Sequence, residues 1–173
     1  MSLPRCVLGI DPGSSGAVAL LGVNGKPIMV FDVPTVLAYK SSKTRRMLDA
    51  NGLTRNIKRM LIPHPATIAV VEDVRAMPGQ GVSSMFSFGK SFGIALGVLA
   101  ALEISTELVP PERWKKHFRL GRDKEQARAL AARLYPTVEL ELKRHQNRAE
   151  ALLLARYYQE QVLGKYSTRI RLR

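Results

Sequence analysis

Residues 6–13 read CVLGIDPG, an apolar run that ends in one aspartate and a Pro-Gly turn. A short apolar run bounded by turn residues predicts a buried β-strand over residues 6–10. The ordinary role of Asp11 here is to open the turn, because aspartate accepts hydrogen bonds from the backbone that follows it. The alternative is that Asp11 is a functional carboxylate at the end of a central strand.

The rest of the chain predicts a sheet with helices on its faces. Strands are expected at 16–23, 27–33, 67–74 and 105–109, and Asn24-Gly25 is a strong hairpin turn. Helices are expected at 51–61, 83–103, around Trp114, at 122–135 and at 147–163, with loops at 35–50 and 76–81. An antiparallel three-stranded meander followed by βαβ crossovers gives an α/β fold, with a mixed five-stranded sheet flanked by helices.

Composition favours one basic domain. The length of 173 residues suits a single domain, 1–173, in which residues 164–173 form a basic C-terminal tail. Lys and Arg number 27 against 14 Asp and Glu, a formal net charge of +13. Such an excess suits a polyanionic partner, because each neutralised phosphate releases condensed counterions. A ribosome-associated or merely soluble basic protein remains the alternative.

The single cysteine and the hydropathy pattern indicate the cellular compartment of the protein. Cys6 lies in an apolar run and has no second cysteine for an internal disulfide, so it is expected to be a core residue in a reducing compartment. The N-terminus lacks the long apolar segment of a signal peptide. The most apolar stretch, 92–102, is far shorter than the roughly 20 residues of a membrane span. We expect no membrane association and a soluble protein of the cytoplasm or another DNA-containing compartment.

Two further carboxylates stand beside apolar sequence. Glu72 ends the apolar run of the strand at 67–74, on the same face as Ile68 and Val70. If the first and fourth strands are neighbours, Glu72 approaches Asp11. Glu150 lies near the start of the last helix, where Asn147 and Glu150 also fit a capping box. Gathered carboxylates repel unless a cation lies between them, and hard oxygen ligands favour Mg²⁺ or Mn²⁺.

The helix at 83–103 carries small residues at every fourth position. Gly89, Gly93, Gly97 and Ala101 line one face of it, and small residues let another backbone approach closely. The approaching backbone belongs either to the sheet or to another helix, and the sequence does not separate the two.

At this point the sequence resembles a known family. Gly9-Ile10-Asp11-Pro12-Gly13 with Gly16 is similar to the first-strand motif of the RuvC-type Holliday-junction resolvases. The segments VVEDV at 70–74 and RAEALL at 148–153 resemble the second and the last acidic motifs of that family. The Ser- and Gly-containing stretch 83–97 and the GRDK turn at 121–124 match in order and spacing. The resemblance covers about residues 5–160 and is nearest to the phage and chloroplast branch.

The resemblance implies an RNase H-like, two-metal endonuclease. Asp11 would bridge two Mg²⁺ or Mn²⁺ ions, Glu72 would bind one of them and Glu150 the other. Lys124 would lie near the scissile phosphate. A homodimer would place two such sites on opposite strands of branched DNA, a four-way junction.

One segment departs from the family pattern. Family members usually carry a further Asp, or sometimes His, a few residues before the last acid, where this chain reads His145-Gln146-Asn147. His145 is either a metal ligand or proton-transfer group, or a surface histidine on a basic loop. Asn147 is either a weak ligand and helix cap, or a lost carboxylate.

Basic side chains around the acidic motifs are candidates for contacts with the DNA backbone. They are Arg75, Lys115, Lys116, Arg122, Lys124, Lys143, Arg144 and Arg148, with Lys40, Lys43, Arg45 and Arg46 in the 35–50 segment. Met77, in the loop after Glu72, is either a wedge between bases at the junction or a core residue. Trp114 is expected in the core rather than as a stacking platform.

Three other functions compete with a junction resolvase. An ATP-binding domain of the actin and sugar-kinase type shares a Gly-Ile-Asp-x-Gly motif, but it needs a second domain and a second phosphate loop that this sequence lacks. Another RNase H-like nuclease, acting on RNA–DNA hybrids or ribosomal RNA, is also compatible with the motifs. The departure at 145–147 leaves room for a non-catalytic protein that binds branched DNA.

Overall fold

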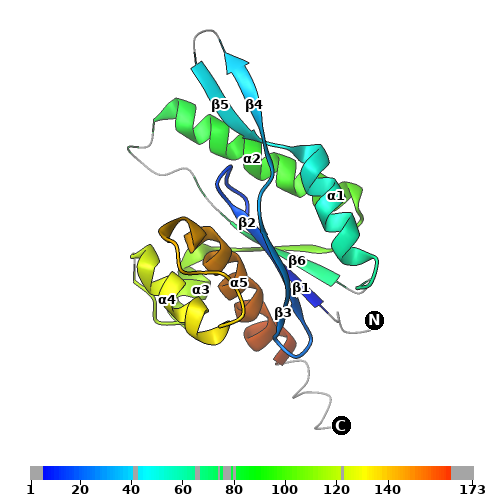
Figure 1. Ribbon diagram of the computed structural model, residues 1–173, viewed down its shortest axis with the longest axis vertical. Helices are drawn as coiled ribbons and strands as arrows, with labels where there is room; N and C mark the ends of the chain where they lie inside the picture. The colour runs from blue at the N-terminus through cyan, green and yellow to red at the C-terminus, as the bar shows by residue number, and fades with distance from the viewer. Residues whose placement is uncertain are drawn as a thin grey trace.

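A mixed five-stranded sheet runs through the middle of the molecule in the order β3-β2-β1-β6-β7 (Figure 1). This computed structural model describes residues 6–40, 43–64, 67–73, 75, 79, 81–121 and 123–164. The sheet strands are β1 (Cys6–Asp11), β2 (Ala17–Gly22), β3 (Pro27–Asp32), β6 (Thr67–Glu72) and β7 (Thr106–Val109). The predicted α/β class, with antiparallel and parallel strands in one sheet, is confirmed.

The central strand is β1, and its neighbours differ in direction. It pairs antiparallel with β2, from Cys6↔Gly22 to Asp11↔Ala17, and parallel with β6, from Cys6↔Thr67 to Ile10↔Val71. The predicted adjacency of the first and fourth sheet strands is therefore confirmed. Cys6 is a core residue as predicted, and burial raises the pKa of its thiol.

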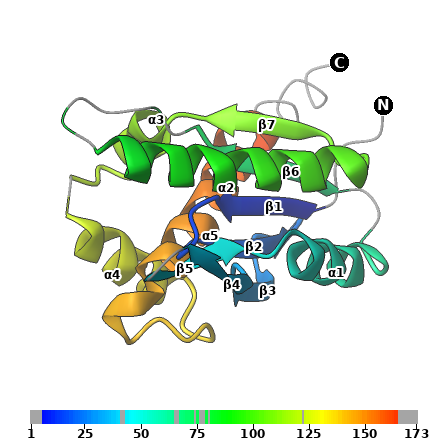
Figure 2. The ribbon, with the colours of Figure 1, turned by 90° about the horizontal axis from the view of Figure 1, so that it is seen from above.

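Helices cover both faces of the sheet, which gives three layers (Figure 2). One face is covered by α1 (Ala50–Leu61) and α2 (Val82–Ala101). The other carries α5 (Gln146–Tyr158), flanked by α3 (Pro111–His117) and α4 (Lys124–Leu134). A 3₁₀ turn, η1 (Lys143–His145), precedes α5, and a π-helical segment, η2 (Gln159–Leu163), follows it. Each face of the sheet has its own hydrophobic core. Successive side chains of β1 point to opposite faces, so Val7 packs in the core beneath α5, and Leu8 and Ile10 pack in the core beneath α1 and α2.

Helix α5 lies unusually close to β1. A Cβ atom on Gly9 would sit 2.1 Å from the carbonyl oxygen of Ala151, so only glycine permits this approach. Residues 149–155 of α5 are all buried. A helix buried all round is a core helix rather than an amphipathic surface helix.

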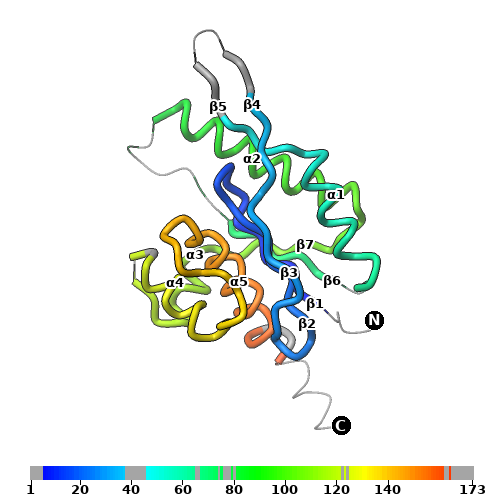
Figure 3. Tube along the Cα trace, viewed as in Figure 1, coloured from blue at the N-terminus to red at the C-terminus, as the bar shows by residue number. Residues whose placement is uncertain are grey.

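The segment 35–50 was predicted as a loop, and that prediction is wrong. It contains a two-stranded antiparallel hairpin, β4 (Thr35–Lys40) and β5 (Lys43–Leu48), and β5 lies against α2 (Figure 3). Val36 and Leu37 are both largely exposed, and Leu48 is buried. A ribbon that is solvated on both faces needs no alternation of apolar and polar residues, so the pattern that marks a half-buried strand is missing.

Helix α2 buries only a narrow stripe of side chains, namely Ser91, Ala95, Val98 and Leu99. Nothing lies within 4 Å of a Cβ built on Gly89, Gly93 or Gly97, so these glycines do not serve packing on the sheet. By length and composition, α2 alone among helices in the described parts of the chain could cross a bilayer, and 22% of it is buried. The apolar segment is therefore longer than the stretch 92–102 taken from the sequence, because the whole of Val82–Ala101 is one apolar helix. An apolar helix with an exposed glycine stripe presents a surface that another helix can approach.

Candidate active site

The three predicted carboxylates come from β1, β6 and α5. Asp11 and Glu72 directly follow Ile10↔Val71, the last paired residues of the parallel β1 and β6. By alternation, Asp11 shares the face of Val7 and Gly9, and Glu72 shares the face of Val70. That face is the one covered by α5. The two strand-end carboxylates therefore lie side by side beneath the helix that carries Glu150.

Glu150 is buried, with an exposed fraction of 4%. It precedes Ala151, the residue whose carbonyl touches Gly9, so it lies over the sheet near β1. The capping-box interpretation of Asn147 and Glu150 is wrong, because α5 begins at Gln146 and its N-cap residue, His145, makes no side-chain cap. Glu150 is thus a buried carboxylate within the helix, and burying such a charge is costly unless a cation or hydrogen bonds offset it.

Helix α3 connects two of the carboxylates. The indole Nε1–H of Trp114 donates to Oε1 of Glu72 at 2.9 Å. The next residue, Lys115, places its Nζ 3.4 Å from Oε1 of Glu150 and 5.1 Å from the centre of the Trp114 ring. Consecutive residues of one short helix therefore reach Glu72 and Glu150, so these two carboxylates lie near each other.

Trp114 is fully buried, as predicted for a core residue. Its donation to Glu72 was not predicted, and neither was the ion pair between Lys115 and Glu150. The only sequence signal for them is that a tryptophan and a lysine stand together in a segment which the fold returns to the ends of the parallel strands. The ammonium group of Lys115 lies on the buried carboxylate of Glu150, and its predicted contact with DNA stays a prediction.

The loop after β1 is held in place by several hydrogen bonds. The Gly13 amide donates to Oδ1 of Asp11 at 3.4 Å, and the Gly16 amide donates to the Gly13 carbonyl at 2.8 Å. The Asn147 side-chain amide donates to the Ser15 carbonyl. Asn147 is therefore a link between α5 and the Asp11 loop, and the prediction that it caps the helix is wrong.

His145 is not a surface residue, because only 1% of it is exposed. Its imidazole lies with the carboxylates of Glu139 and Glu141, and the three potential ligand atoms are within 4.8 Å of one another. Its role as a ligand or proton-transfer group beside Asp11 stays a prediction.

Arg148 is engaged within the protein. Its Nε and Nη2 donate to the two carboxylate oxygens of Asp32 at 2.6 and 2.9 Å. This bidentate pair lowers the pKa of Asp32 and raises the pKa of Arg148. A guanidinium held this way is less available for a DNA phosphate than the sequence suggested.

The remaining basic candidates differ in how much the structure says of them. Arg75, Lys116, Lys143 and Arg144 are exposed, and Arg75 lies 3.4 Å from Asp73. Lys124 begins α4, but its side chain lies outside the described residues, as do Met77, Arg122, the side chains of Lys40, Lys43 and Arg45, and the tail after Gly164. The predicted roles of these residues stay predictions.

Two hollows meet beside the Asp11 loop, and both are lined by Ser14 and Arg46. The hollow between β5 and α2 has a volume of about 160 Å³, and Phe86 and Lys90 also line it. The hollow between the Asp11 loop and the start of α5 has a volume of about 340 Å³ and adds Lys143 and Arg144. We call this pair of hollows the basic groove. Its four basic side chains were not predicted to share one surface, because the β4–β5 hairpin that carries Arg46 was not predicted.

Comparison with solved structures identifies the fold. Thermus thermophilus RuvC in complex with a Holliday junction substrate is similar to this chain with a TM-score of 0.62 and 15% sequence identity, over 91% of this chain and 96% of that one. A second Thermus thermophilus RuvC structure gives a TM-score of 0.53 and 16% identity, over 90% and 95%. Fowlpox virus resolvase in complex with Holliday junction DNA gives a TM-score of 0.42 and 13% sequence identity, over 90% of this chain and 99% of that one. No protein-family model and no curated protein matches the chain.

The mixed sheet, with its meander, its parallel strands and the helix α5 across β1, is the RNase H-like fold. Within that class, the chain has the fold of RuvC over nearly its whole length. The fold expected from the acidic motifs is thereby confirmed.

The Lys115–Glu150 pair makes a prediction for stability. Lys115→Met should lower the free energy of unfolding by about 2 kcal/mol, because it removes the ammonium group 3.4 Å from the buried carboxylate of Glu150. The loss is smaller than for a fully buried pair, because 27% of the Lys115 side chain is exposed to solvent. Lys116→Met, on the exposed side of the same helix, should change it by less than about 0.5 kcal/mol. Urea unfolding of both variants in EDTA measures the difference. Equal effects would mean that Lys115 does not stabilise Glu150.

Proposed function

We propose that this chain is a metal-dependent endonuclease that cuts branched DNA, and specifically that it resolves four-way junctions. The observation that carries the proposal is the gathering of Asp11, Glu72 and Glu150 on the α5 side of a RuvC fold. The basic groove beside the Asp11 loop and the net charge of +13 support a nucleic-acid substrate. Such a role would place the protein in an intracellular compartment that contains DNA.

The donor set fits a hard divalent cation. The three side chains supply only carboxylate oxygens, which suit Mg²⁺ or Mn²⁺, and buried Glu150 already attracts a cation, the ammonium group of Lys115. Asp11, Glu72 and Glu150 would hold two such ions. When bound, the metal lowers the pKa of a water that attacks phosphorus and stabilises the charge on the leaving oxygen.

The chain's own residues would then keep these ligands in position. Trp114 fixes the Glu72 carboxylate through its indole N–H, so that Glu72 presents its other oxygen in a set direction. Lys115 stabilises the charge of Glu150 before a cation arrives and would move toward the DNA phosphate when one binds. Asn147 holds the Asp11 loop against α5, which keeps the strand-end and helix carboxylates at a fixed spacing.

The basic groove would hold a DNA strand next to the carboxylates. Arg46, Lys90, Lys143 and Arg144 supply positive charge, and Ser14 and Ser15 extend the groove to the loop that follows Asp11. Contacts of this kind go to phosphates and set the position of the duplex arms without reading sequence. Phe86, with 73% of its surface exposed, offers a flat apolar face on which an unpaired base could stack.

Cleavage of labelled four-way junctions, duplexes and RNA–DNA hybrids tests the function. Junctions should be nicked in Mg²⁺ or Mn²⁺ and left intact in excess EDTA. Asp11→Asn should abolish cutting and leave junction binding unchanged or tighter, because one negative charge near the phosphate is removed. Asp73→Asn, which changes a neighbouring acid that pairs with Arg75, should keep activity.

The outcomes separate the competing functions. Activity that survives in EDTA would rule out the metal mechanism. Preferential cutting of hybrids would indicate another RNase H-like nuclease, and junction binding without any cutting would indicate a non-catalytic binding protein.

The groove makes its own prediction. In the Asp11→Asn background, Arg46→Gln with Lys143→Gln should weaken junction binding and reduce the slope of log K against log salt by about 0.9 for each lost phosphate contact. Arg59→Gln on α1, outside the groove, should change neither. Fluorescence anisotropy at several salt concentrations measures both values. An unchanged slope would place the DNA elsewhere on the protein.

We further propose that the chain acts as a homodimer through the exposed stripe of α2. Two symmetric cuts in a junction need two sites, and the stripe of Gly89, Gly93 and Gly97 would let a second α2 approach closely. The low burial of this apolar helix supports the same arrangement, because an apolar face left in water is a common mark of a protein interface.

A leucine in the stripe tests the dimer. Gly93→Leu should convert the dimer to a monomer at micromolar concentration, since its side chain would keep the two helices apart. Ala129→Leu on the exposed side of α4 adds similar bulk away from α2 and should stay dimeric. Sedimentation equilibrium distinguishes the two states. A wild-type monomer that binds and cuts junctions would contradict the proposal.

A further inference from the structure

A second group of potential metal ligands lies in the segment that connects α4 to α5. One oxygen of Glu139, one oxygen of Glu141 and one ring nitrogen of His145 lie within 4.8 Å of one another. Both glutamates are exposed, and Leu140 between them is 1% exposed and belongs to the core beneath α5. The buried leucine anchors the segment, so both flanking carboxylates project on its outer side.

His145 gives independent evidence that this group has a ligand. The residue is 1% exposed, and its Nδ1 is buried without a hydrogen-bond partner in the described structure. A buried polar atom without a partner costs free energy, and native proteins rarely leave one so. A bound cation would use the imidazole as a ligand, with the carboxylates completing the set.

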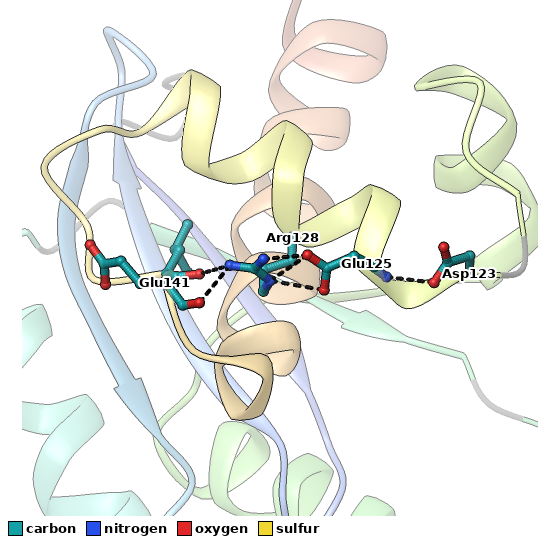
Figure 4. A network of polar contacts seen from close by, with 5 residues as sticks. Asp123, Glu125, Arg128 and Glu141 are labelled. Carbon is teal, nitrogen blue, oxygen red and sulfur yellow. Dashed lines mark hydrogen bonds and ion pairs between the residues drawn. The ribbon is translucent and has the colours of Figure 1, made fainter.

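The backbone that carries the carboxylates is held in a fixed position. Arg128 of α4 donates from Nη1 to the carbonyl oxygens of Leu140 and Glu141, and its guanidinium is held in turn by Glu125 (Figure 4). The Glu141 side chain points away from this network, as the same view shows. Arg128 therefore fixes the segment without occupying the carboxylates that face His145, which is what a preorganised ligand set requires.

Arg148 forms ion pairs with both Glu139 and Asp32. Arg148 reaches Oε2 of Glu139 only at 3.5 Å, because its two shorter hydrogen bonds go to Asp32. Asp32 lies close enough for His145 to contribute to its lowered pKa, so a third carboxylate is near the histidine. Arg144 acts on Asp32, and Arg128 acts on Glu141, through longer-range electrostatic interactions. In the described structure, the ion pairs of Arg148 go to Asp32 and Glu139 and not to Glu141.

We infer that Glu139, Glu141 and His145 bind one divalent transition-metal ion of the zinc class, at a site separate from Asp11, Glu72 and Glu150. One imidazole nitrogen with two carboxylate oxygens suits Zn²⁺ better than Mg²⁺, and water would fill the remaining position. The ion would tie Glu139 and Glu141 of the α4–α5 connection to η1, whose last residue, His145, is the N-cap of α5. This inference does not depend on the proposed nuclease activity.

The test measures zinc binding directly in a full-length chain whose other carboxylates are disabled. In an Asp11→Asn, Glu72→Gln background, calorimetric titration with Zn²⁺ should give one ion per chain and raise the Tm by at least about 3 °C at saturation. His145→Ala in that background should weaken binding at least about tenfold and remove the rise in Tm. His64→Ala, a histidine outside the group, should behave like the background.

Because His145 is buried, its alanine variant could fail to fold, and circular dichroism checks this. The exposed pair Glu139→Gln and Glu141→Gln provides a second route, since these variants should fold normally and lose zinc binding together. Absence of zinc binding in the background chain, or zinc binding that survives both sets of changes, would overturn the inference. Loss of binding on disabling Asp11 and Glu72 alone would assign His145 to the nuclease site instead.

Discussion

The contact between Gly9 and the backbone of α5 determines where the candidate active site forms. Because glycine has no side chain, the carbonyl of Ala151 can rest directly on the central strand, and Glu150 is carried down to the level of the sheet with it. Asp11 lies two residues beyond Gly9 on the same face. One steric condition therefore joins the packing of the core to the spacing of the carboxylates, and α3 completes the site by reaching two of them from the side.

The charges of the protein are arranged in two kinds of environment. Some cations form ion pairs within the protein that hold segments in place: Arg128 pairs with Glu125, and Arg148 pairs with Asp32. Others, such as Arg46 and Lys143, are exposed along the groove beside the Asp11 loop. The net charge alone does not distinguish these groups, since an arginine that fixes a loop and one that meets a phosphate look alike in the sequence.

Much of the fold followed from the sequence, because β1, β6 and α5 are apolar runs with turn residues at their ends. The adjacency of Asp11 and Glu72 followed from strand order alone. The β4–β5 hairpin did not, since Val36 and Leu37, on opposite faces of β4, are both exposed, and the basic residues of the segment resemble a loop. The partners of Trp114 and Asn147 could not be predicted either, because each contact joins segments far apart in the chain, Asn147 with Ser15 being one example. Such contacts depend on side-chain positions that periodicity does not encode.

The strand order of the sheet also bears on how the protein is made. Parallel pairing of β1 with β6 joins residues far apart in sequence, and α5 packs on β1 only after every other strand of the sheet has been synthesised. Contacts of such long range form late and slowly in folding. A ribosome-bound chain would thus carry Asp11 and Glu72 well before Glu150 reaches them. On the proposed function, a chain whose synthesis has not yet reached α5 would carry Asp11 and Glu72 without Glu150, so its candidate site would be incomplete.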